Sequence, residues 1–226
     1  MNYLKLNYPE SEYGLQQYPQ QLCDYLTRRF FTPLGSLLDI GSGKGNHLIG
    51  FARNGFTVKG VDKEIINLPG FDIQECNLEK DNLPFEGNTF DYVYSKSVIE
   101  HISNTHHFIQ EIYRVLKLGG VVVCLTPDWG TDYKTFWDDP THIKPFTRKG
   151  LQKAFELEDF INIKCERFYQ LPFLWKHPSF RFVRYIISLL PTRFKWNGKI
   201  QRVLIRHSKE AMLLLSAKKS DSRGIG

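Results

Sequence analysis

Short apolar runs alternate with longer amphipathic segments along most of this 226-residue chain. The apolar runs have the length of buried strands, and the amphipathic segments repeat apolar residues at helical spacing. Strands that alternate with helices predict a parallel sheet covered by helices on both faces. We expect strands at 37–40, 57–64, 121–129, 159–170 and 209–219, with two more inside 71–95. We expect helices at 19–31, at 47–54, in a segment ending near Leu116, and at 147–155.

A glycine-rich turn, LLDIGSGKGNH at residues 37–47, joins the first expected strand to the helix that follows it. Gly41, Gly43 and Gly45 occupy alternate positions, so the backbone can adopt positive φ values and approach a ligand closely. Asp39 ends the strand, at the edge where open α/β sheets bind ligands. The start of the next helix offers free N–H groups to an anionic group. This turn is therefore the first candidate for a binding site.

Three kinds of nucleotide-binding turn contain glycines at comparable spacing. A phosphate-binding P-loop is excluded, because Leu38 stands at its first glycine and Gly45 at its Ser/Thr position. A dinucleotide-binding turn needs a glycine where this chain has Asn46. The third kind, D/E-x-G-x-G-x-G, is matched from Asp39 to Gly45 and occurs in S-adenosylmethionine (SAM) enzymes.

Motifs after the turn extend this pattern at the expected distances. Asp62 follows Gly41 by 21 positions, as does the carboxylate that accepts hydrogen bonds from both ribose hydroxyls of a nucleotide. Leu-Pro-Phe at 83–85 and Phe-Asp at 90–91 follow, and we expect Asp91 to orient backbone. With these motifs the chain resembles class I SAM-dependent methyltransferases of the type-11 methyltransferase-domain kind.

The resemblance covers roughly residues 35–165 and the last strand, and it implies a Rossmann-like α/β fold. The implied sheet has seven strands in the order 3-2-1-4-5-7-6, with strand 7 antiparallel. We expect a single domain over residues 1–226, in which 1–34 form an N-terminal arm and helix. A basic, aromatic helical insert at 170–207 separates strands 6 and 7.

The resemblance also implies SAM as the cofactor and S-adenosylhomocysteine as its product. Asn77 stands where the family has an acid, and its amide oxygen can still accept from the adenine amino group beside the Leu78 N–H. Ser95 and Lys96 should face the methionine end of the cofactor. The residues expected to bind the cofactor are Asp39, Gly41, Gly43, Asn46, Asp62, Lys63, Asn77, Leu78 and Ser95.

The segment after the fifth strand, residues 128–146, is long for a connection and rich in aromatic, acidic and imidazole groups. Such a loop beside the expected methyl group suggests an acceptor pocket. The alternative is a proline-bounded loop that only packs on the sheet. DPTHIKPFT at 139–147 resembles a motif of methyltransferases tied to bacterial surface glycans and lipopolysaccharide.

Methylation of a weakly acidic hydroxyl needs a base. His142 is our first candidate and His101 our second, with Asp138 or Asp139 as the orienting partner. For His101 the alternative is a structural role at a helix start. This chemistry requires no metal and we predict no metal ligands, although the histidine and aspartate residues of the loop leave a metal site open as an alternative.

Charge is distributed unevenly along the chain. Residues 1–163 contain 16 Lys and Arg against 21 Asp and Glu, whereas residues 164–226 contain 14 against 3, a net charge of +11. Within the basic part, residues 182–189 place apolar side chains on one helical stripe. This pattern predicts peripheral contact with an anionic membrane through 170–207. Nucleic acid is the less favoured partner. Packing on the domain or a dimer interface is the alternative, and monomer and homodimer both stay open.

Other features of the chain bear on its compartment. The four cysteines are far apart, which predicts neither a zinc site nor a disulfide framework. The N-terminus lacks a signal-peptide pattern, and no apolar run approaches the ~20 residues that span a bilayer. We therefore expect a cytoplasmic protein, peripheral at the inner membrane face.

These expectations combine into a SAM-dependent methyltransferase acting on an oxygen or nitrogen of a small-molecule or glycan acceptor. The motif at 139–147 favours a lipid- or nucleotide-linked sugar of surface polysaccharide biosynthesis. One alternative is an NAD(P)-dependent oxidoreductase, against which Asn46 and the pattern at 77–91 count. The other is a non-catalytic, methyltransferase-like adaptor module.

Overall fold

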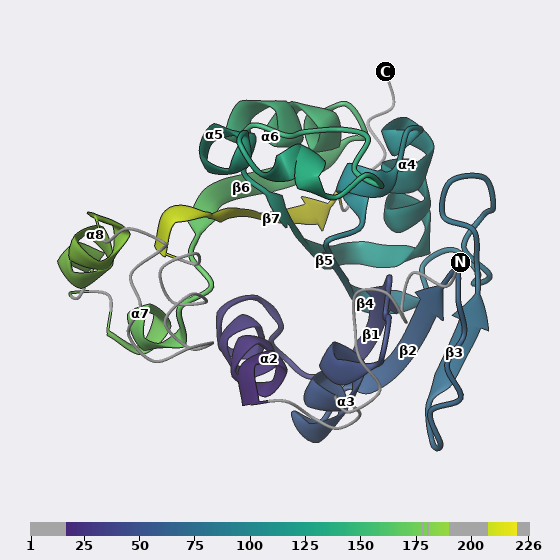
Figure 1. Cartoon of the computed structure of the whole chain (residues 1–226). Helices are drawn as coiled ribbons and strands as arrows, with labels where there is room; N and C mark the ends of the chain where they lie inside the picture. Colours follow the sequence, from purple (N-terminus) through teal and green to yellow (C-terminus); the bar gives the residue numbers. More distant parts are fainter. Residues whose placement is uncertain (1–16, 178, 180, 190–207, 221–226) are drawn as a thin grey trace.

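The computed structural model describes residues 17–177, 179, 181–189 and 208–220. These residues form a seven-stranded sheet in the order β3-β2-β1-β4-β5-β7-β6 (Figure 1). The strand β7 runs antiparallel to both neighbours, as predicted. The strands are β1 Ser36–Ile40, β2 Thr57–Asp62, β3 Asp72–Glu75, β4 Phe90–Lys96, β5 Leu116–Pro127, β6 Phe160–Phe168 and β7 Met212–Lys219.

Helices cover both faces of the sheet (Figure 1). The core consists of two hydrophobic clusters, one on each face of the sheet. Successive side chains of β4 point to opposite faces, so Val93 packs against α4 and α6 while Tyr92 and Tyr94 pack against α2 and α3. The helices are α2 Gln17–Phe30, α3 Asn46–Arg53, α4 Thr105–Val115, α5 Trp129–Asp132, α6 Arg148–Glu156, α7 Pro172–Lys176 and α8 Arg181–Leu189. Two 3₁₀ turns, η2 Ile99–His101 and η3 Phe136–Asp138, complete the described elements.

The start of β5 differs from expectation. The sequence predicted a strand at 121–129, whereas the strand already begins at Leu116 and pairs with Phe90. Asp91 explains part of this extension, since its carboxylate binds both Ser36 N–H (2.8 Å) and Lys117 Nζ (2.9 Å). The structural role predicted for Asp91 is confirmed.

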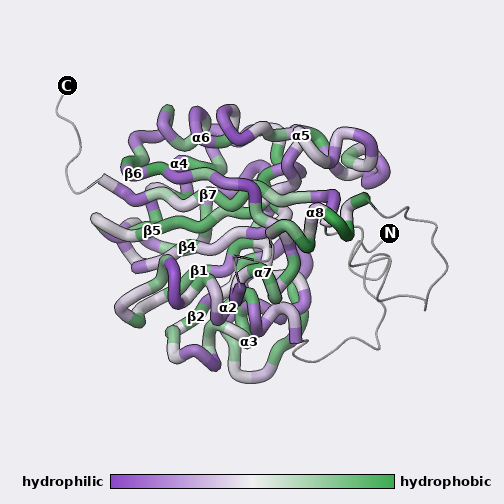
Figure 2. Tube along the Cα trace, turned by 90° about the vertical axis from the view of Figure 1, so that its left-hand side faces the viewer, coloured by the Kyte–Doolittle hydropathy of each residue, from purple (hydrophilic) through white to green (hydrophobic). Residues whose placement is uncertain are grey.

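The insert after β6 divides into two helices with different surroundings. Trp175 of α7 stacks on Phe168, with 5.0 Å between ring centroids, and lies 5.3 Å from Tyr25 of α2. In contrast α8 lies at the margin of the molecule, and Figure 2 shows a run of hydrophobic positions along it. The predicted arm at 1–16 and the remainder of the insert at 190–207 lie outside the described residues. No helix among the described residues is long and apolar enough to cross a bilayer.

Candidate functional site

The glycine turn lies at the carboxyl end of β1, between the ends of β2 and β4. Gly41, Gly43 and Gly45 all have positive φ, at 75°, 51° and 72°, as the alternate spacing predicts. A Cβ atom at Gly43 would meet no atom within 4 Å, whereas one at Gly41 would lie 2.2 Å from Val98. Gly43 therefore faces open space into which a ligand can come close to the backbone.

Asp62 ends β2 beside this turn, as expected from its spacing. One carboxylate oxygen accepts from the Gly43 N–H at 2.8 Å and the other from the Glu64 N–H at 3.2 Å. Each oxygen keeps a further lone pair, so the carboxylate can hold the turn and still accept hydrogen bonds from vicinal hydroxyls. Asp62 therefore fixes the shape of the site as well as offering ribose contacts.

Asp39 and Ser95 carry buried polar atoms with no hydrogen-bond partner among the described residues. Asp39 is 2% exposed, and both its Oδ2 and the Ser95 Oγ lack a partner. Burial, with a smaller contribution from Asp62, raises the pKa of the Asp39 carboxyl to about 8. Unsatisfied buried groups of this kind fit a ligand that brings hydrogen-bond donors or positive charge, as the amino-acid end of SAM does.

His47, in the first turn of α3, extends this set of polar groups, although the sequence suggested no role for it. Its Nε2 is buried without a partner, and its ring lies 5.3 Å from that of Tyr94. Burial and the charge of Lys96 lower the pKa of His47 to about 3, so the imidazole is neutral. The sequence feature that could have indicated a role for His47 is its position at the end of the glycine turn.

The other expected cofactor residues occupy the same edge of the sheet. Asn77 follows β3 and closes a turn, because its amide oxygen accepts from the Glu79 N–H at 3.2 Å. The expected contact of Asn77 and Leu78 with adenine remains a prediction. Asn46 is the first residue of α3, and Lys63 is exposed just after β2.

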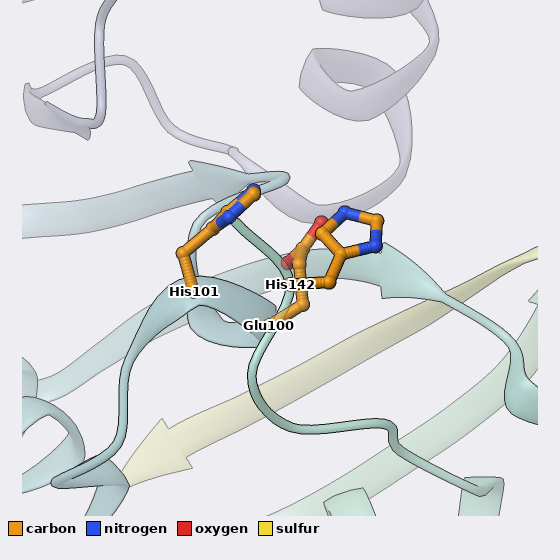
Figure 3. A group of neighbouring side chains, drawn as sticks. All are labelled: Glu100, His101 and His142. Atoms are coloured by element: carbon orange, nitrogen blue, oxygen red, sulfur yellow. The ribbon is translucent and has the colours of Figure 1, made fainter. Parts of the chain in front are cut away.

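A second group of functional side chains comes from η2 and from the loop that precedes α6. Glu100 of η2 joins the two segments, because its carbonyl oxygen accepts hydrogen bonds from the N–H groups of Ile143 (2.9 Å) and Lys144 (3.0 Å) in the loop. This link brings His101 and His142 together, with 4.8 Å between their ring centroids. Both histidines that the sequence singled out thus lie in one place (Figure 3).

The tautomers of both histidines follow from their partners. His142 Nδ1 lies 2.6 Å from the carbonyl oxygen of Phe136, and His101 Nδ1 lies 3.0 Å from that of Thr141. A carbonyl oxygen can only accept, so each Nδ1 carries the proton in this arrangement. Burial lowers the pKa of His101, which favours this neutral form.

The orienting partner expected for His142 was wrong. The Phe136 carbonyl orients the ring, and neither Asp138 nor Asp139 does so through Nδ1. Asp139 instead accepts from the Thr141 N–H (2.9 Å) and hydroxyl (2.6 Å), which shapes the turn before His142. Burial opposes ionisation of Asp139, but these bonds and the nearby histidines hold its pKa below the usual value.

Glu100 is the member of this group that was not predicted as a site residue. It is 1% exposed, its Oε2 accepts from the Thr126 hydroxyl at 2.9 Å, and its Oε1 lacks a partner among the described residues. Burial raises its pKa to about 7. The adjacent Glu-His pair was the available signal, but the burial of Glu100 follows from the packing of η2 on β5.

Comparison with known proteins identifies a family and several relatives that are similar to this chain. Residues 15–164 match the family model described as a methyltransferase domain. The chain is 34% identical over 161 residues to phosphoethanolamine N-methyltransferase 2 of Caenorhabditis elegans, covering 62% of this chain and 36% of the relative. It is 32% identical over 122 residues to a ubiquinone biosynthesis O-methyltransferase of Maricaulis maris, covering 46% of each. The chain thus spans less than half the length of these relatives.

Solved structures share the fold. A SAM-dependent methyltransferase from Archaeoglobus fulgidus superposes with a TM-score of 0.65 and 18% identity over 89% of this chain and 94% of that one. Phosphoethanolamine N-methyltransferase 2 of Haemonchus contortus, solved with phosphomonomethylethanolamine and S-adenosylhomocysteine, gives 0.59 and 23% over 89% and 52%. The glycine turn, the strand order and the family match lead to one conclusion: the chain belongs to the methyltransferase-domain family, whose cofactor is SAM.

Proposed function

We propose that this protein transfers the methyl group of SAM to an oxygen or nitrogen of a small-molecule or glycan acceptor. The observation that carries the proposal is the pairing of two sites at one sheet edge. One is a glycine turn lined by unpartnered buried polar groups. The other is a pair of histidines whose ring centroids lie 4.8 Å apart and whose Nδ1 atoms are held by backbone carbonyls.

Asp39, Gly43, Asp62 and Ser95 would hold the cofactor, whose sulfonium supplies an activated methyl group together with its leaving group. The protein then needs only to place the acceptor in line with that methyl group and to exclude water. Residues 128–146 form the acceptor loop, and the Glu100 carbonyl oxygen supports this task by binding that loop close to the end of β4.

His142 would take the proton of an acceptor hydroxyl at its Nε2. The hydrogen bond from Nδ1 to the Phe136 carbonyl fixes the ring and stabilises the imidazolium that forms. His101, whose ring lies 4.8 Å away, would orient the acceptor. Asp139 would add negative charge near both rings, since its carboxylate interacts electrostatically with them.

The loop motif at 139–147 favours a lipid- or nucleotide-linked sugar of surface polysaccharide biosynthesis as the acceptor. Transfer of label from methyl-labelled SAM should be assayed with sugar nucleotides, lipid-linked sugars, phosphoethanolamine and a catechol. Label in a sugar would support the glycan acceptor. Label only in phosphoethanolamine or the catechol would move the acceptor to the chemistry of the named relatives. No transfer from a protein that binds SAM would favour the adaptor alternative.

Replacing Asp62 with alanine should weaken SAM binding by about 1–3 kcal/mol, because it removes charged hydrogen bonds to ribose and the support of Gly43. Titration calorimetry measures the change. Asp72→Ala is the matched control, since Asp72 lies on the neighbouring strand and pairs with Lys59 on the surface. Equal SAM affinity in the two variants would overturn the ribose role of Asp62.

The α8 helix supports a peripheral membrane role at the cytoplasmic face of the inner membrane. Phe182, Tyr185 and Leu189 are 60%, 60% and 66% exposed, so the stripe predicted from the sequence is not buried against the domain. The net charge of +11 over residues 164–226 complements anionic lipid. A helix with exposed aromatic and aliphatic residues in a basic region can lie in a bilayer interface.

Liposome flotation tests this surface. We expect flotation with anionic vesicles, loss with added salt, and loss in the Arg181→Glu, Arg184→Glu variant. Leu157→Ser is the control, because Leu157 is 70% exposed and lies outside the insert. If folded, SAM-binding protein stays at the bottom of the gradient with anionic vesicles, the helix has another partner.

A further inference from the structure

Three possible metal-ligand atoms lie close together beside the acceptor loop, one each from Glu100, His101 and His142. One ligand atom from each residue lies within 4.8 Å of the others. Figure 3 shows the Glu100 carboxylate between the two imidazole rings. Two imidazoles and one carboxylate make up a common ligand set for divalent transition metals in proteins. We propose that these three side chains bind a divalent first-row transition metal and leave at least one coordination position open.

The hydrogen bonds around the three side chains match what a metal site requires. Metal-binding histidines usually donate their other ring N–H to a carbonyl or carboxylate, which fixes the ring and the tautomer. Both histidines do so here, with carbonyl oxygens of Phe136 and Thr141 as acceptors. The second oxygen of Glu100 likewise accepts from Thr126. Each side chain is therefore oriented before any ion binds.

The remaining oxygen of Glu100 is an independent indication of a ligand. It is buried, it has no hydrogen-bond partner among the described residues, and it is part of the carboxylate that lies within the donor group. Leaving such an oxygen without a partner is unfavourable, and more so when the group is charged. A cation at this position would remove that cost.

The spacing requires a modest contraction on binding. Bonds of about 2.0–2.2 Å place neighbouring ligands about 3.0–3.4 Å apart, so the longest separation must shorten by about 1.5 Å. Partial exposure of His101 and His142 leaves room for this movement. Nitrogen donors favour zinc, cobalt, iron or nickel over magnesium or calcium, which prefer oxygen.

The consequence for catalysis rests on the proposed methyl transfer. An acceptor hydroxyl in the open position would release its proton to solvent more readily, because a bound cation lowers the pKa of a coordinated oxygen. The same oxygen would then be the nucleophile. Ligation occupies the Nε2 lone pair of His142, so in the metal-bound state the cation replaces this histidine as the means of deprotonation.

Metal binding can be measured without any methyl acceptor. Protein prepared without a histidine tag and stripped with chelator should take up one equivalent of Zn²⁺, and Co²⁺ should give visible absorption bands. Glu100→Gln, His101→Ala and His142→Ala should each weaken Co²⁺ binding at least 100-fold. Thr126→Val should weaken it about 10-fold, because it removes an outer hydrogen bond.

The control is His106→Ala, whose imidazole pairs with Glu158 outside the group. It should bind Co²⁺ like the unchanged protein, and circular dichroism should show that all variants fold. Less than about 0.2 equivalents of Zn²⁺ and Co²⁺, or equal Co²⁺ affinity in all variants, would overturn the site. Metal binding without methyl transfer would leave the site standing and remove the proposed activity. Equal methyl transfer with and without chelator would overturn only the catalytic role of the metal.

Discussion

His142→Ala is expected to lower turnover about 10²–10⁴-fold with little change in SAM affinity, because it removes the group that deprotonates or holds the acceptor. The histidine lies in the acceptor loop, and its Nδ1 donates to the carbonyl of Phe136. The glycine turn and Asp62 are untouched by the change. Single-turnover rates with the true acceptor and calorimetry with SAM separate the two effects.

The matched control for turnover is His106→Ala, which removes an imidazole paired with Glu158 and distant in role from the acceptor loop. It should retain the unchanged rate. Turnover of His142→Ala within twofold of this control would show that His142 is structural. If turnover of His142→Ala does fall, chelator treatment distinguishes metal ligation by His142 from direct proton transfer. A rate that falls on metal removal in unchanged protein points to ligation, and an unaffected rate points to direct proton transfer.

SAM affinity is expected to rise about tenfold per pH unit between pH 5.5 and 7.5. Burial raises the pKa of Asp39 to about 8, so its carboxyl is protonated in the free protein over this range. The positive charge of SAM favours the carboxylate and lowers that pKa, so binding below pH 8 must expel a proton. Higher pH removes the cost of that expulsion, which fixes the sign of the effect.

Calorimetry in two buffers of different ionisation enthalpy measures the proton release directly. Close to one proton per SAM is expected at pH 6.5. Asp39→Asn keeps the shape of the side chain and should bind with an affinity independent of pH over this range. Constant affinity in the unchanged protein, with no proton release, would show that Asp39 is already ionised or that SAM does not act on it.

Local chemistry explains why the cofactor half of the site could be predicted. The positive φ values at Gly41 and Gly43, and the cap that the Thr147 hydroxyl places on α6, depend on residues within a few positions of one another. Asp62 was found by its distance from the turn, because parallel strands return their carboxyl ends to the same edge. The order of the strands came from the resemblance and is confirmed.

Long-range packing decided the acceptor half. Residues Glu100 and His142 are far apart in the chain, and they meet because the Glu100 carbonyl accepts from the loop backbone at Ile143 and Lys144. The early start of β5 has the same origin, since Leu116 pairs with Phe90 of β4, which is distant in the chain.

The sequence by itself determined the glycine turn, the sheet order through its family resemblance, and the choice of His101 and His142 as candidate bases. Only the tertiary structure decided that a carbonyl orients His142, that Glu100 is buried beside it, and that Asp39 is held at raised pKa. The physical reason is that desolvation and hydrogen-bond partnership depend on which distant segments surround a group, and residue spacing does not encode those neighbours.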